Sequence, residues 1–62
     1  MKIHFITQGE PFLQALIAAL SPLHEVSENT SGAMPTADTQ AVVIAEGVST
    51  SDPQWQKAQE LQ

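Results

Sequence analysis

Residues 2–20 read KIHFITQGEPFLQALIAAL and decide the fold class. The stretch opens, over 2–7, with a short run rich in β-forming residues, which suits a central parallel strand covered on both faces. Its second half repeats apolar residues at the i, i+3, i+4, i+7 spacing of one helical face, and these are Leu13, Leu16, Ile17 and Leu20. The sequence therefore predicts a strand, a tight turn and a helix over 11–20, ended by Ser21-Pro22.

The turn between this strand and helix is Thr7-Gln8-Gly9-Glu10-Pro11. A nucleotide-binding βα unit places a glycine-rich turn here, whose backbone N–H groups bind a diphosphate. Gly9 is either such a phosphate contact or simply the residue that makes the turn. Glu10 interacts favourably with the positive end of the helix dipole and repels a diphosphate at the same position. We interpret the turn as a helix start on a phosphate-binding frame.

The rest of the chain continues the α/β pattern. A second short strand is expected over 23–27, and the polar stretch 28–40 is expected to be a loop or a weak helical turn. Residues 41–45, AVVIA, are the clearest buried strand, and a last, mostly polar helix is expected over 53–61.

The expected fold class is α/β, with a parallel sheet of about three strands and two helices in one small domain over 1–62. Right-handed crossovers place the strands in the order 2-1-3. The last helix has a strong start, with Asp52 as N-cap and Pro53 at its first position.

Composition narrows the classes of function. Seven acidic residues against two lysines give a net charge of −5, so the chain lacks the basic stripe that nucleic acids or anionic membranes require. It has no cysteine and no Cys/His cluster, which excludes disulfides and structural zinc. The apolar run 12–20 is too short to span a bilayer, and we expect a cytoplasmic protein. A domain of 62 residues is marginally stable, which favours self-association or a neighbouring domain.

Two stretches carry a resemblance to a known family. The start MKIHFI with its turn, helix and the later HEVS resembles the first domain of the Mur ligases, and AVVIAEGVSTSDPQWQKAQEL is similar to a later segment of that domain. Phe12-Leu13 most resembles the UDP-N-acetylmuramate–alanine and muropeptide ligase branch. The resemblance implies a small Rossmann-like domain that holds a UDP-N-acetylmuramyl substrate in peptidoglycan biosynthesis or recycling. It would not be catalytic alone, so whether the chain belongs to an enzyme stays open.

The resemblance also implies where such a substrate would bind. The matching positions lie at the ends of the three expected strands, where open α/β sheets bind ligands. They are Thr7, Gln8, Gly9, Ser27, Gly47 and Ser49. No catalytic residue and no metal ligand is assigned, and ATP and magnesium are expected only if the chain is part of a full-length ligase.

The sequence departs from the family pattern at these same turns. Thr7 and Glu10 stand where the family has glycine, and after the second strand Glu28 and Thr30 replace a glycine and an acid. The family's helix between the second and third strands is missing. These departures weaken the implied nucleotide site more than the implied fold.

Other candidate residues have ordinary structural interpretations. His4, within the first strand, is expected to be a packed, hydrogen-bonded core histidine rather than a catalytic one. His24 is expected at a strand edge, and the two histidines lack metal-like spacing. Ser49, Thr50 and Ser51 could bind an anion at the last helix, but Asp52 competes for the same N–H groups.

An alternative function belongs to another class. The chain could be a non-catalytic interaction or oligomerisation module that keeps this scaffold and has lost the nucleotide site. Trp55 and an exposed sheet edge would then form the contact, although Trp55 is equally suited to the core. A shortened or redesigned chain that only folds is a third possibility.

Overall fold

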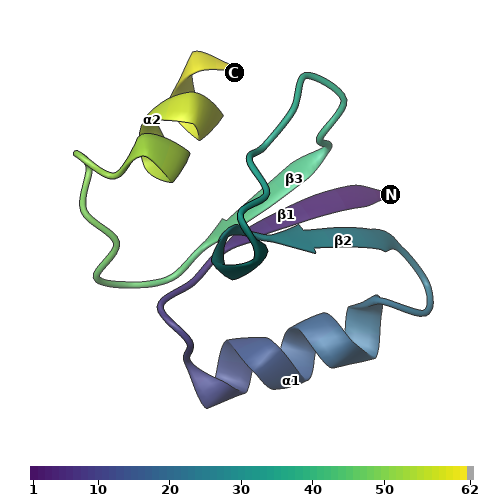
Figure 1. Cartoon of the computed structure of the whole chain (residues 1–62). Coiled ribbons are helices and arrows are strands. Elements are labelled where there is room, and N and C mark those ends of the chain that lie inside the picture. The colour runs from purple at the N-terminus through teal and green to yellow at the C-terminus, as the bar shows by residue number, and fades with distance from the viewer. Residues whose placement is uncertain (62) are drawn as a thin grey trace.

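The computed structural model describes residues 1–61 and has an α/β fold (Figure 1). Its elements follow the expected order of strand, helix, strand, short helical turn, strand and helix. They are β1 (Lys2–Ile6), α1 (Pro11–Leu20), β2 (Glu25–Glu28), the 3₁₀ turn η1 (Asn29–Ser31), β3 (Ala41–Ile44) and α2 (Pro53–Glu60). No helix within residues 1–61 combines the length and apolar character needed to cross a bilayer.

The three strands form one parallel sheet in the order β2-β1-β3, as predicted. The central strand β1 pairs with both neighbours, with Ile3 opposite Val26 on one side and opposite Ala41 on the other. β1 is buried because a strand pairs with each of its edges, and because α1 and α2 lie over its two faces. Phe5 and Ile6 have no exposed surface.

Side chains alternate along β1, so the two faces of the sheet differ in chemistry. Ile3 and Phe5 point to the face covered by α1, where they form the core with Leu13 and Ala45. His4 points to the opposite face, where it contacts Gln54 of α2. The result is a three-layer arrangement in which the face under α1 is apolar and the face under α2 is partly polar.

Element boundaries differ from the sequence prediction by one or two residues in each strand and at the end of α2. β2 begins at Glu25 rather than at residue 23, because the end of α1 continues into a turn in which the amides of Leu23 and His24 both donate to the Leu20 carbonyl. β1 ends at Ile6, β3 at Ile44 and α2 at Glu60, each one residue early, and β2 extends one residue further than predicted, to Glu28. The weak helical turn expected in the polar loop is η1.

Candidate functional site

The carboxyl end of β1 is locked to the end of β2 by one side chain. Asn29 Oδ1 accepts a hydrogen bond from the Thr7 amide at 2.8 Å, and Asn29 Nδ2 donates to the Thr7 carbonyl at 3.0 Å. Thr7 is only 3% exposed. Because the carboxyl ends of neighbouring parallel strands lie side by side, the residue after β2 is well placed to bind the backbone after β1. The Thr7 N–H is therefore already hydrogen-bonded within the protein.

The next amide of the turn is occupied as well. The Gln8 N–H donates to Glu10 Oε1 at 2.6 Å, so the carboxylate folds back over its own turn. Gly9 lies between them with φ +86°, in the left-handed region, and the space around its Cα is open. A glycine is required here for the backbone conformation of the tight turn. The positive φ therefore explains Gly9 as the residue that makes the turn. The Glu10 carboxylate occupies the place where an anion would bind.

The turn is also tied to the end of β3. Gln8 Nε2 donates to the Gly47 carbonyl at 3.2 Å. Gly47 has φ +95°, and a Cβ there would lie 3.4 Å from Gln8 Oε1. Together with Asn29, this contact joins the loops that follow all three strands. The predicted residues Thr7, Gln8, Gly9 and Gly47 are thus brought to one edge of the sheet.

A half-buried carboxylate at the end of β2 completes this cluster. Glu28 Oε2 accepts hydrogen bonds from Gln14 Nε2 at 2.5 Å and from Thr7 Oγ1 at 2.8 Å. Both bonds hold the pKa of the Glu28 carboxyl below its ordinary value of 4.5, and the bond from Gln14 has the larger effect. Glu28 is therefore ionised at neutral pH. It adds a fixed negative charge beside the first turn.

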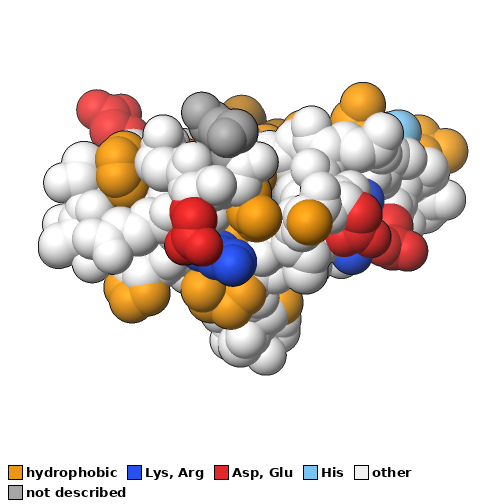
Figure 2. All heavy atoms as spheres, turned by 90° about the horizontal axis from the view of Figure 1, so that it is seen from above, with side chains coloured by type: hydrophobic (Ala, Val, Ile, Leu, Met, Phe, Trp, Pro, Cys, Tyr) orange, Lys and Arg blue, Asp and Glu red, His pale blue; other side chains and the backbone are white. Residues whose placement is uncertain are grey.

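Positive charge lies elsewhere. Lys2 is at the opposite end of β1, 2.9 Å from Asp38 and 3.8 Å from Glu25, and Lys57 on α2 is 3.8 Å from Glu60. These are the two cationic side chains of the protein apart from histidine. Figure 2 agrees, since each blue patch in that view lies against red. No lysine or arginine therefore offsets the negative charges of Glu10 and Glu28 at the turn.

A second polar cluster lies on the face under α2, centred on His4. Its ring has no exposed surface, and both nitrogens are 2.7 Å from a partner: Nδ1 from Ser27 Oγ and Nε2 from Gln54 Oε1. Gln54 Nε2 donates to the Ala33 carbonyl at 2.6 Å, which leaves its oxygen to accept from His4. His4 Nε2–H therefore donates to Gln54 Oε1, and Nδ1 faces the Ser27 hydroxyl. The prediction of a hydrogen-bonded core histidine is confirmed.

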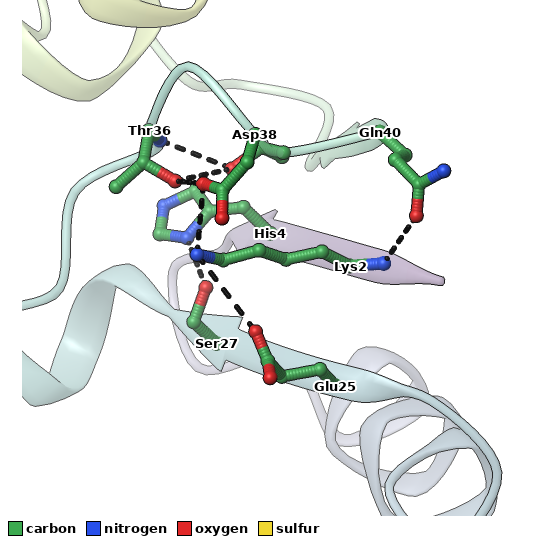
Figure 3. A network of polar contacts seen from close by, with 8 residues as sticks. Lys2, His4, Glu25, Ser27, Thr36, Asp38 and Gln40 are labelled. Carbon is green, nitrogen blue, oxygen red and sulfur yellow. Dashed lines mark hydrogen bonds and ion pairs between the residues drawn. The ribbon is translucent and has the colours of Figure 1, made fainter.

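Further along the same face, Lys2 joins the loop after η1 to the sheet (Figure 3). Its ammonium contacts Asp38 and Glu25, and its amide donates to Gln40 Oε1 at 2.9 Å. The hydrogen bond with Asp38 is the main cause of a raised pKa of Lys2, whereas hydrogen bonds from Thr36 and Lys2 lower the pKa of Asp38. Lys2 and Asp38 are thus both charged at neutral pH, and their ion pair holds this loop in place.

Two of the predicted binding residues lie apart from the turn. Ser27 points to the α2 face, where it contacts His4 rather than the loops. Ser49 is exposed before α2, and its hydroxyl contacts Ser51 Oγ at 2.7 Å. Asp52 caps α2 as predicted, accepting from the Gln54 amide at 2.8 Å. Trp55 is half-buried, which leaves its role as core or contact residue open.

Sequence reasoning did not identify Asn29 or Gln54 as site residues. Asn29 had a usable signal, because it directly follows a predicted strand whose end must lie beside the end of the first one. Gln54 had none, since it is one of several glutamines in a polar helix. His24 lies just before β2, with Nδ1 3.4 Å from the amino terminus.

No group of three or more histidine, cysteine, aspartate or glutamate side chains in residues 1–61 is arranged to hold a metal ion. No family model matches the chain, and neither the curated proteins nor the solved structures include a match to it.

Proposed function

We propose that this chain is a non-catalytic interaction domain built on a nucleotide-binding frame whose phosphate turn is closed. One observation carries the proposal: the amides of Thr7 and Gln8 are hydrogen-bonded to Asn29 and Glu10 of the same chain. A diphosphate would have to displace both side chains to reach these donors. The domain would then act through association rather than through a bound nucleotide.

The charge around the turn supports the same proposal. Glu10 and Glu28 lie at the turn, and both lysines form ion pairs elsewhere. Two unit charges about 4 Å apart interact by about 4 kcal/mol at an effective dielectric constant of about 20, so a diphosphate beside these carboxylates is opposed strongly. Phosphate sites in proteins normally supply donors or cations instead.

The buried histidine does not favour a catalytic function. Both nitrogens of His4 are satisfied within the protein, and its neighbour Gln54 is fixed in turn by the Ala33 carbonyl. A general base must reach a substrate proton with a free lone pair. His4 has no exposed surface through which a substrate could reach it.

A direct test is titration of UDP and of UDP-N-acetylmuramate into the protein, followed by amide NMR shifts. We expect no localised shifts at residues 7–12 or 27–30 up to millimolar ligand. Saturable shifts confined to these residues would overturn the proposal. ADP serves as a matched control that carries the same diphosphate without uracil.

A second candidate is the substrate-holding role implied by the Mur ligase resemblance. It is favoured by the first turn of α1, where Glu10 makes no side-chain hydrogen bond to the helix and leaves the amides of Phe12 and Leu13 without a cap. If Glu10 merely blocks such a site, Glu10→Gly should raise UDP affinity to a measurable level. Glu60→Gly, which removes an exposed carboxylate at the end of α2, is the control. An unchanged lack of binding in Glu10→Gly would contradict this second candidate.

A further inference from the structure

A methionine sulfur lies against the side chain that links α2 to the sheet. Met34 belongs to the loop between η1 and β3, and its Sδ is 2.9 Å from Gln54 Nε2. The same amide nitrogen has two hydrogens and donates the other to the Ala33 carbonyl at 2.6 Å. The amide oxygen of Gln54 faces His4 Nε2 at 2.7 Å. Both polar atoms of Gln54 are therefore used to join α2, this loop and β1.

The sulfur is also accessible to small molecules in solution. Met34 is 43% exposed, whereas the next residue, Pro35, is fully buried. The buried proline anchors the backbone of the loop while part of the Met34 side chain stays at the surface. Thioether sulfur that oxidants can reach is converted to the sulfoxide, which sulfoxide reductases convert back. Met34 thus combines access for an oxidant with a contact inside the fold.

Oxidation would change the contact between Met34 and Gln54. A thioether sulfur is a weak hydrogen-bond acceptor in an apolar side chain, whereas a sulfoxide is polar. The nitrogen and the sulfur are 2.9 Å apart, which is already the usual spacing of about 2.9 Å between a nitrogen donor and an oxygen acceptor. An oxygen atom bound to the sulfur accepts from Gln54 Nε2 only after the two side chains have moved apart. The present contact therefore does not survive oxidation.

We propose that Met34 is a modification site at which a peroxide oxidises the thioether to the sulfoxide and so loosens α2 from the sheet. A lone pair of the sulfur forms the new S–O bond, and the O–O bond of hydrogen peroxide breaks. The other oxygen takes up the proton of the transferred oxygen and leaves as water. The sulfur is oxidised by two electrons, and the peroxide is reduced by two. The site lies on the α2 face, so the proposal does not depend on whether the first turn binds a diphosphate.

The position of α2 depends on this contact because the helix buries little else. Ala58 is its one buried residue, and the Gln54 side chain supplies the hydrogen bonds to the loop and to His4. Displacement of Gln54 takes a partner from the Ala33 carbonyl and from the buried ring, and a buried polar group without a partner is costly. Trp55, the next residue and half-buried, then becomes more exposed.

The chain contains a matched control for this oxidation, since it has two methionines and one tryptophan. Met1 is 61% exposed, so peroxide reaches both sulfurs and exposure alone does not distinguish them. Met1→Leu leaves Met34 as the one methionine, and Met34→Leu leaves Met1. Fluorescence of Trp55 then reports on α2 in both variants.

Mild treatment with hydrogen peroxide, followed by peptide mass mapping and fluorescence, tests the proposal. In Met1→Leu we expect one added oxygen at Met34 and a shift of Trp55 emission to longer wavelength, which methionine sulfoxide reductase reverses. In Met34→Leu we expect one added oxygen at Met1 and no shift. Failure of Met34 to take up oxygen overturns the proposal. So does an unchanged emission after Met34 is oxidised, or an equal shift in Met34→Leu.

The side-chain amide NMR signals of Gln54 test the same step without the tryptophan. They should move when Met34 is oxidised and stay in place when only Met1 is oxidised. The side-chain amide of Gln8, which donates to the Gly47 carbonyl, is an internal control and should not move. Gln54 signals that remain unchanged after complete oxidation of Met34 contradict the proposal, as does an equal movement of the Gln8 signals.

Discussion

His4 occupies the centre of the sheet with no exposed surface and a partner at each ring nitrogen. A buried polar group is tolerated only when its hydrogen bonds are made, and here Ser27 and Gln54 make them. Gln54 also holds the loop after η1 through the Ala33 carbonyl, so the ring links β2, β1, this loop and α2. One residue therefore connects elements that are far apart in the sequence.

Replacing this residue should be costly. His4→Leu removes both hydrogen bonds and leaves Gln54 Oε1 facing an apolar side chain, so we expect the free energy of unfolding to fall by about 1–3 kcal/mol. Urea unfolding followed by circular dichroism measures it. His24→Leu, at a half-buried position outside the sheet, should cost less than about 1 kcal/mol. Equal losses in the two variants would contradict the assignment of His4 as a central link.

The sequence was sufficient to predict that His4 is buried, because a central parallel strand is covered on both faces and its side chains are therefore buried. It was not sufficient to identify the partners. Ser27 was predicted to face the nucleotide turn, yet alternation along β2 sends its side chain to the α2 face, where it contacts His4. Gln54 is 50 residues away from His4, and no local pattern reports such a contact.

At the scale of elements, the two helices begin differently although both start with proline. Asp52 caps α2 through the Gln54 amide, whereas Glu10 turns back toward Gln8 and leaves α1 without a side-chain cap. α1 compensates with the apolar stripe that packs on the sheet, including Leu13, Leu16 and Ile17. Each helix has one buried residue, Leu13 in α1 and Ala58 in α2, but α2 lacks such a stripe, so its cap carries more of its stability.

This contrast gives a prediction for paired substitutions. Asp52→Ala should lower the free energy of unfolding by about 1 kcal/mol, since it removes an N-cap hydrogen bond. Glu10→Ala should lower it by less, because its exposed bond to Gln8 does not cap a helix. Thermal unfolding of the two variants side by side gives the order. A larger loss for Glu10→Ala would contradict the difference between the two helix starts.

The order of elements and the bounds of α1 follow from sequence because apolar spacing and proline are local signals. The start of β2 does not, since it depends on how many residues the end of α1 uses in its closing turn. The order β2-β1-β3 was also predictable, because right-handed crossovers leave few alternatives.

At the scale of the whole molecule, stability depends on carboxylates that the fold keeps ionised. The lowered pKa of Glu28 means that folding favours its charged form. This contribution is present above the ordinary value of 4.5 and is lost as the pH falls through the lowered pKa in the folded state. Asp38 acts in the same direction.

We therefore expect Glu28→Gln to weaken the loss of stability on acidification. The free energy of unfolding of the wild type should fall more steeply below about pH 4.5 than that of the variant, which cannot lose this charge. Urea unfolding across the acidic range measures both slopes. Glu60→Gln is a matched control at an exposed carboxylate of α2 and should keep the wild-type slope. Parallel curves for the wild type and Glu28→Gln would contradict a role for Glu28.

The closed first turn is the central feature of this account, and amide hydrogen exchange at the turn tests it most directly. Thr7 and Gln8 should exchange slowly, because their N–H groups donate to Asn29 and Glu10, while Gly9 should exchange fast. Glu10→Ala should remove the protection of Gln8 and leave that of Thr7. Fast exchange of both Thr7 and Gln8 in the wild type would mean that the turn is open, and it would contradict the account.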